Sequence, residues 1–134
     1  MEENESAIRY SAGLIRRATQ PKYFRALDER DGYAKRIGDC GDVVEFMLRV
    51  APDKLTVSEV GYQTIGCMAM IASCDVAAEM AEGRTLDAVL DLTPEQVVEA
   101  LGGVPEQKFH CTELAVATLH DAARKAREEA DGGV

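Results

Sequence analysis

Alternating hydrophobic positions predict a small sheet in the first half of the chain. Residues 43–50 alternate in the way that is typical of a strand with one buried face, with Val44, Phe46, Leu48 and Val50 on that face and Glu45, Met47 and Arg49 on the other. After a turn, a second strand runs over 55–62, and its alternation slips by one position near Ser58 and Glu59, as a β-bulge would cause. We expect the two strands to pair as an antiparallel hairpin, with residues 33–37 as the third strand.

The second half of the chain changes to helical periodicity. Residues 67–82 are rich in Ala and Met, contain no Gly or Pro and are followed by a glycine, so they predict a long helix. Threonine caps indicate two shorter helices, one over 85–90 and one that opens at 93 and closes at Gly102 and Gly103. Apolar residues from 114 to 126 recur on one stripe and predict a long C-terminal helix.

A shorter amphipathic pattern over 7–20, whose apolar face carries Ile8, Leu14 and Ile15, predicts a helix near the N-terminus that Pro21 ends. Because strands come first and helices later, the fold class is α+β: a three-stranded antiparallel sheet packed against several helices. A chain of 134 residues can build one core without disulfides. We therefore expect one domain over 1–134, with the N-terminal helix and a loop in 1–30 and a flexible tail over 130–134.

Composition and charge exclude some classes of partner and indicate the compartment in which the protein works. The chain has 24 acidic and 15 basic residues and a net charge of −9, which argues against a nucleic-acid partner because such partners need clustered Lys and Arg. No apolar run approaches the ~7–15 residues of a signal-peptide core or the ~20 of a membrane span, so we expect a cytoplasmic protein that does not bind membranes. In that reducing compartment, four cysteines indicate metal ligands or reactive thiols.

Three of the four cysteines lie at the ends of predicted elements. Cys40 precedes a strand, whereas Cys67 and Cys111 open helices, where the positive end of the helix dipole stabilises a thiolate. Cys74 lies seven residues after Cys67, about 10.5 Å along the helix axis, which is too far for both to bind one tetrahedral ion. We therefore predict that Cys74 is a small buried residue of the core.

A metal site built on three thiols needs another ligand. Asp42 lies two residues after Cys40 at the start of a strand, so both side chains point to the same side. His110 stands beside Cys111 and offers an imidazole, an equally acceptable ligand for zinc or iron. The sequence leaves both candidates open. His120 lies off the apolar stripe of its helix, and we expect it to be solvated.

Three short segments of the chain resemble the three signature segments of the NifU/IscU-type iron-sulfur cluster scaffold family and occur in the same order. The likeness extends from about residue 33 to residue 127. The segments are Cys40-Gly41-Asp42 before a strand, Gly66-Cys67 opening the helix that reads Met70-Ile71-Ala72-Ser73, and Lys108-Phe109-His110-Cys111 opening the last helix.

The resemblance implies a carrier rather than an enzyme. A labile 2Fe-2S cluster would be assembled on the protein from iron and the sulfur of a cysteine desulfurase, with an electron donor, and then passed to apo iron-sulfur proteins. Zinc would often fill the site on purification. The residues that match the family's site are Cys40, Asp42, Cys67, His110 and Cys111 as metal ligands, with Cys111, Cys40 and Cys67 also as sulfur acceptors, and Lys108, Gly41 and Gly66 as flanking residues.

Within this resemblance Asp42 matches the carboxylate that makes the cluster labile. The segment Val104-Pro105-Glu106-Gln107-Lys108 replaces the Leu-Pro-Pro-Val-Lys segment through which a dedicated chaperone acts, and this argues against chaperone-assisted transfer. An alternative is a SufU-like, zinc-dependent sulfur acceptor with zinc held by Cys40, Asp42, Cys67 and Cys111, although such relatives carry an insertion between the second and third cysteines. A third hypothesis is a structural zinc protein that only docks partners.

Overall fold

Three strands form one antiparallel sheet in the order β1-β2-β3 in a computed structural model that describes residues 9–132. The predicted hairpin and its third strand are confirmed, and β3 continues three residues beyond the predicted end. The register aligns Ile37, Val43 and Ile65 across the sheet, so β1 and β3 end where β2 begins. The bounds are β1 Gly32–Ile37, β2 Val43–Val50 and β3 Val57–Ile65.

The predicted bulge is confirmed in β3. Arg49 pairs with Glu59 but Val50 pairs with Val57, which leaves Ser58 as the extra residue. The Ser58 hydroxyl donates a hydrogen bond to the carbonyl of Arg49 across the bulge, at 3.2 Å. The extra residue explains why the hydrophobic alternation slips at this point.

The helices follow the capping signals of the sequence. Ser11, Thr85 and Thr93 each accept a backbone N–H at a helix start, and Thr93 forms a full capping box with Gln96. The first helix is shorter than predicted because Ser11 caps it, and residues 7–8 lie outside the described range. The bounds are α2 Ala12–Thr19, α3 Met68–Ala81, α4 Leu86–Leu90, α5 Pro94–Leu101, a 3-10 turn Glu106–Lys108 and α6 Phe109–Gly132.

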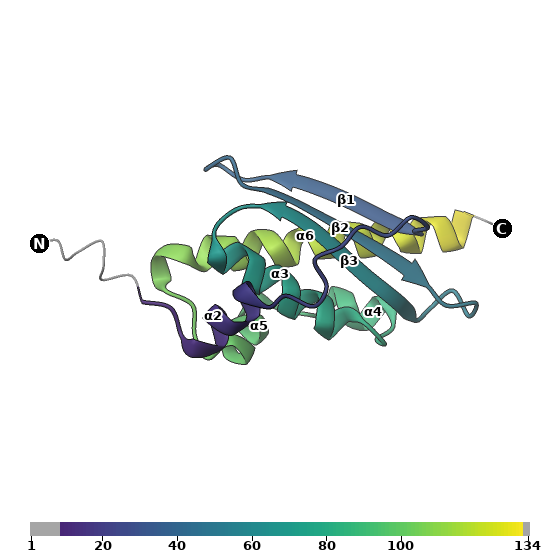
Figure 1. The fold of residues 1–134 in the computed structure, drawn as a ribbon. Helices are drawn as coiled ribbons and strands as arrows, with labels where there is room; N and C mark the ends of the chain where they lie inside the picture. The colour runs from purple at the N-terminus through teal and green to yellow at the C-terminus, as the bar shows by residue number, and fades with distance from the viewer. Residues whose placement is uncertain (1–8, 133–134) are drawn as a thin grey trace, which may run out of the picture.

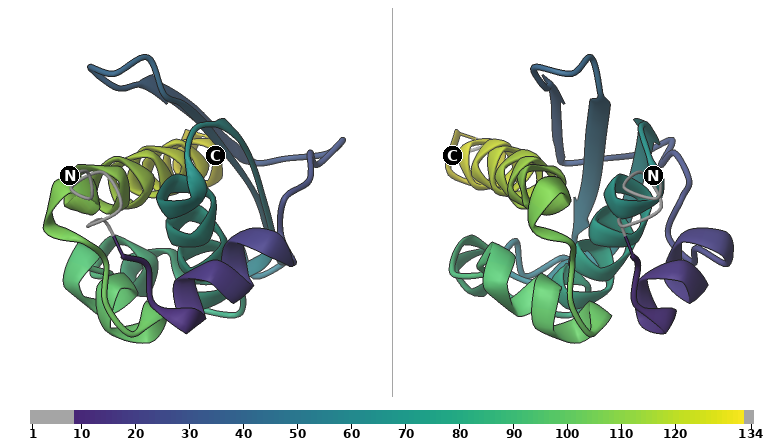
Figure 2. Two further views of the ribbon diagram at one scale, coloured as in Figure 1. Left: turned by 60° about the vertical axis from the view of Figure 1, so that its left-hand side comes forward. Right: turned by 90° about the vertical axis from the view of Figure 1, so that its left-hand side faces the viewer.

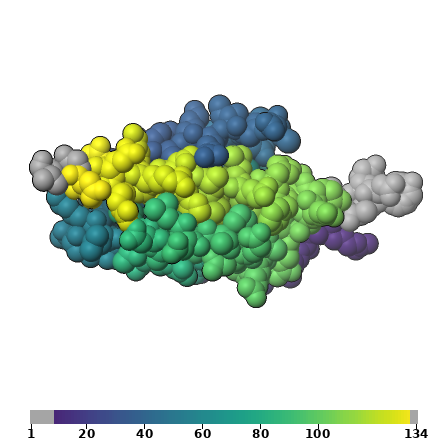
Figure 3. All heavy atoms as spheres, turned by 180° about the vertical axis from the view of Figure 1, so that it is seen from behind, coloured from purple at the N-terminus to yellow at the C-terminus, as the bar shows by residue number. Residues whose placement is uncertain are grey.

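Helices α3 and α6 pack against one face of the sheet. Helix α6 contacts β1 and β2 while α3 contacts β3, and α2 and α5 lie on the side of α3 away from the sheet (Figures 1 and 2). Seen from behind, α6 forms a band between β1 and the shorter helices α4 and α5 (Figure 3). The α+β class with a long C-terminal helix is therefore confirmed. None of the helices within residues 9–132 is long and apolar enough to cross a membrane.

Strand β2 is more deeply buried than its alternation predicts. Val44, Phe46 and Leu48 face the helices and are fully buried, as expected. Met47 was expected on the solvent side, yet it is only 1% exposed. The segment before β1 crosses this second face of the sheet, and the N–H of Leu27 donates to the Met47 sulfur at 3.4 Å.

Two other expectations need correction at the helices. Ile15 of α2 is 42% exposed rather than buried beside Leu14. His120 is half-buried rather than solvated, and its Nε2 atom has no hydrogen-bond partner among the described residues. Burial lowers the pKa of this imidazole. The tail expected over 130–134 is helical as far as Gly132, and residues 133–134 lie outside the described range.

Candidate metal centre

The β1–β2 connection and the starts of α3 and α6 meet at one end of the molecule (Figure 1). Cys67 is the N-cap residue of α3, and Cys111 lies in the first turn of α6. Their Sγ atoms are 3.8 Å apart. The starts of both helices therefore lie at the same pair of thiols, and in α3 the N–H groups of Ala69 and Met70 point at the Cys67 sulfur.

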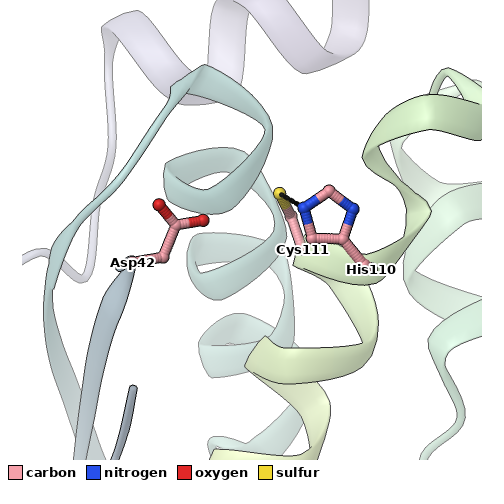
Figure 4. A group of neighbouring side chains, drawn as sticks. All are labelled: Asp42, His110 and Cys111. Atoms are coloured by element: carbon pink, nitrogen blue, oxygen red, sulfur yellow. Dashed lines mark hydrogen bonds between the residues drawn. The ribbon is translucent and has the colours of Figure 1, made fainter. Parts of the chain in front are cut away.

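Both candidates for the remaining ligand lie beside Cys111. Ligand atoms of Asp42, His110 and Cys111 all lie within 4.8 Å of one another. The imidazole Nε2 of His110 is 3.6 Å from the Cys111 sulfur, and Asp42 faces both from the start of β2 (Figure 4). Cys67 adjoins this group through Cys111. The structure therefore brings together four of the five residues that the sequence singled out as ligands.

Cys40 lies outside that close group. It is exposed on the β1–β2 connection, where the N–H of Gly38 donates to the carbonyl of Asp42 at 2.8 Å and closes a tight turn. Gly41 in this turn has a φ of 90°, which favours glycine. Cys40 and His110 line one groove of about 760 Å³ between the connection and α6. The third thiol is thus close to the group in space without being part of it.

The two adjacent thiols differ in their protonation. The pKa of Cys67 is lowered to about 5, first because the Cys111 thiol donates to it and then because N–H groups of Met70 and Ala69 point at the sulfur, against the effect of burial. The pKa of Cys111 is raised, first by that same hydrogen bond, then by burial and by the negative charges of Cys67 and Asp42. The pair therefore holds one proton at neutral pH.

The predicted flanking residues have identifiable physical roles. Lys108, in the 3-10 turn before α6, lowers the pKa of both thiols by its positive charge. Gly66 lies so close to Met70 that a Cβ at position 66 would be 3.0 Å from the Met70 Cβ, so glycine allows the chain to turn tightly from β3 into α3.

Sequence reasoning missed two hydroxyls beneath the thiols. Ser73 of α3 and Thr112 of α6 are fully buried and hydrogen-bond each other at 2.8 Å. Thr112 falls on the N-terminal extension of the apolar stripe of α6, and this position could have marked it.

The prediction that Cys74 belongs to the core is confirmed. Its side chain is fully buried, and burial raises the pKa of its thiol.

Fold and site together define a class of protein: a small α+β domain that presents thiols with a carboxylate and an imidazole at one end of its sheet. Such mixed ligands suit iron and zinc. The chain belongs to the NifU-like N-terminal domain family, whose model matches residues 9–131. The resemblance seen in the three sequence segments is therefore confirmed.

Two curated relatives cover most of this chain. The iron-sulfur cluster assembly scaffold protein IscU 1 of Archaeoglobus fulgidus is 35% identical over 119 residues, which are 87% of this chain and 73% of the relative. The scaffold protein IscU of Aquifex aeolicus is 32% identical over 120 residues, which are 88% of this chain and 76% of the relative.

Solved structures share the fold at lower identity. A NifU-like protein from Brucella abortus superposes with a TM-score of 0.68 at 20% identity, covering 87% of this chain and 93% of its own. A protein described as a putative SUF-system scaffold from Fervidobacterium islandicum reaches a TM-score of 0.70 at 16% identity, covering 85% of this chain and 96% of its own. These likenesses support the α+β architecture.

Proposed function

We propose that this chain is a scaffold on which a labile 2Fe-2S cluster is assembled and from which it is transferred to apo-proteins. One observation carries the proposal: two thiols 3.8 Å apart adjoin a carboxylate and an imidazole. Four thiolates hold the common 2Fe-2S clusters, and an oxygen or nitrogen ligand replaces one of them here. A hard carboxylate binds iron less durably than a thiolate in a cluster, so this site suits release.

The three cysteines have separate places in this proposal. Cys67 and Cys111 hold the cluster from the helix starts, and Cys40 approaches from the opposite wall of the groove. Because a binuclear cluster is larger than one ion, its ligands need not all lie within the reach of a single metal. Asp42 and His110 are both close enough to Cys111 to supply the remaining ligand. In this proposal Asp42 is the ligand that makes the cluster labile.

Sulfur comes from a cysteine desulfurase in this scheme, iron arrives separately and an electron donor reduces the delivered sulfur. Each cysteine is a candidate acceptor, and Cys40 is the exposed one. Two aliphatic side chains stand beside the site at the end of the sheet, Ile37 at 66% and Ile65 at 74% exposure. We expect this apolar rim to contact the desulfurase when it docks.

A zinc-dependent sulfur acceptor is the second candidate. Asp42, His110 and Cys111 are close enough to share one ion, and Cys67, whose sulfur is 3.8 Å from that of Cys111, is the candidate for a fourth ligand. That arrangement leaves the exposed thiol of Cys40 free to receive sulfur. The close group of Asp42, His110 and Cys111 is the observation that favours this second function.

Anaerobic reconstitution decides between the two. The protein as purified is incubated under anaerobic conditions with ferrous iron, a desulfurase and cysteine, and apo-ferredoxin is then added. We expect the protein to form a cluster that absorbs visible light and to transfer it to the ferredoxin. The Cys67→Ala variant should form no cluster, whereas the matched control Cys74→Ala should form one. If no cluster forms while zinc stays bound and a persulfide accumulates, the scaffold proposal is wrong and the sulfur acceptor is supported.

A further inference from the structure

A buried hydrogen bond joins α3 to α6, the two helices that begin at the adjacent thiols. The hydroxyls of Ser73 and Thr112 are 2.8 Å apart, and both side chains are fully buried. Thr112 follows Cys111 in the chain. Ser73 lies six residues after Cys67, about 9 Å along the axis of α3. The bond therefore connects the middle of α3 to the first turn of α6, and these are the two helices that carry the adjacent thiols.

The buried side chains of α3 and α6 near this bond include the large Met70 and Val116, but several of the others are small. Near this level α3 buries Ala69 and Ala72, and α6 buries Ala115. Small side chains allow close approach, but they interlock less than large ones. A hydroxyl pair is directional, and a shift of either helix that broke it would leave a buried polar group without a partner. The bond thus selects one relative position of α3 and α6.

We infer that Ser73 and Thr112 form a positioning pair that sets the separation of the Cys67 and Cys111 thiols. Neither hydroxyl touches the sulfur atoms, and the effect passes through the helix backbones. The inference rests on the proposed function in assuming that the two thiols act together on one cargo. The separation itself is a property of the protein before any metal or sulfur arrives.

The rate of disulfide closure between Cys67 and Cys111 measures their separation. In a Cys40→Ala, Cys74→Ala background only these two thiols remain, and diamide oxidises them to a disulfide while it is reduced to the hydrazine. We expect Thr112→Val and Ser73→Ala to slow closure severalfold, because the thiols must approach to about 2.05 Å. Thr112→Ser keeps the hydroxyl and should close at the rate of the parent.

Thr118→Val is the matched control. Thr118 is also a fully buried threonine of α6, but its hydroxyl donates to Leu114 within the same helix, at 2.8 Å. It should leave the closure rate unchanged. A parental rate in Thr112→Val, or equal slowing in Thr118→Val, would overturn the inference.

The double variant Ser73→Ala, Thr112→Val separates positioning from stability. Removing both partners eliminates the unsatisfied hydroxyl, so the free energy of unfolding should recover relative to the single variants. Closure should stay slow because the bond is still absent. If closure recovers together with stability, the pair acts through stability alone and the inference is wrong. This assay needs no iron or sulfur donor, so failure of cluster assembly would leave its result unchanged.

Discussion

The thiol of Cys67 lies 3.8 Å from the thiol of Cys111, although 44 positions separate the two residues in the chain. Each sits at the start of a different helix, and one proton is shared between them. Cys67 is thereby the thiolate of the pair and Cys111 the thiol. This asymmetry means that metal or sulfur arriving at neutral pH meets one nucleophile that is already charged.

The reactivity of Cys67 should therefore depend on Cys111. In the metal-free protein we expect its alkylation by iodoacetamide to be nearly constant from about pH 6 to about pH 8, because its pKa is near 5. Cys111→Ala removes the donor that lowers this pKa most, so the pKa should rise and alkylation should now increase with pH over that range. Peptide mass spectrometry gives the rate at Cys67. An unchanged profile in Cys111→Ala would contradict the shared proton, and Cys74→Ala is the control.

Asp42 should determine how long the cluster remains bound to the protein. Its carboxylate lies with His110 and Cys111 in the close group, and replacing it by alanine removes the ligand that we hold responsible for lability. We expect Asp42→Ala to keep its cluster severalfold longer and to transfer it more slowly to apo-ferredoxin, as followed by visible absorbance. Asp39→Ala, in the same connection and exposed, should behave as the parent. An equal cluster lifetime in Asp42→Ala and the parent would remove Asp42 from this role.

Asp75 should be essential to stability rather than to the site. Its fully buried carboxylate accepts hydrogen bonds from Arg17, from the hydroxyl of Tyr62 and from the backbone N–H groups of Lys22 and Tyr23. It therefore ties the N-terminal segment to α3 and β3. We expect Asp75→Asn to lower the free energy of unfolding by about 3–5 kcal/mol in urea titrations, because Arg17 loses its buried partner.

The exposed carboxylate on the same helix provides the comparison for Asp75. Glu79 also pairs with Arg17 but is 45% exposed. Glu79→Gln should cost less than about 1 kcal/mol, since ion pairs in solvent contribute little. Similar losses in Glu79→Gln and Asp75→Asn would show that burial of the carboxylate is not what matters.

Cys74 should be dispensable for assembly. It is fully buried within α3, away from the thiol pair at the helix start. Cys74→Ser should reduce stability by about 1–3 kcal/mol, because it buries a hydroxyl, and should still assemble a cluster at the parental yield. Loss of assembly in a variant that circular dichroism shows to be folded would overturn its structural role.

Local physics made most of the fold predictable. Alternation in residues 43–50 gave β2, the slip at Ser58 gave the bulge, and threonine caps gave the starts of α4 and α5. These features depend on residues close together in the chain. The burial of Met47 and of His120 was not predictable in the same way, because distant segments cover them.

The sequence by itself determined the residue types of the site and their places at element ends, since capping, turn chemistry and helix dipoles are local effects. Only the tertiary structure decided which of these residues meet. It placed Asp42 and His110 together at Cys111, left Cys40 across a groove, and joined Ser73 to Thr112. The physical reason is that sheet register and the packing of α3 on α6 set these distances, and both depend on contacts between residues far apart in the chain.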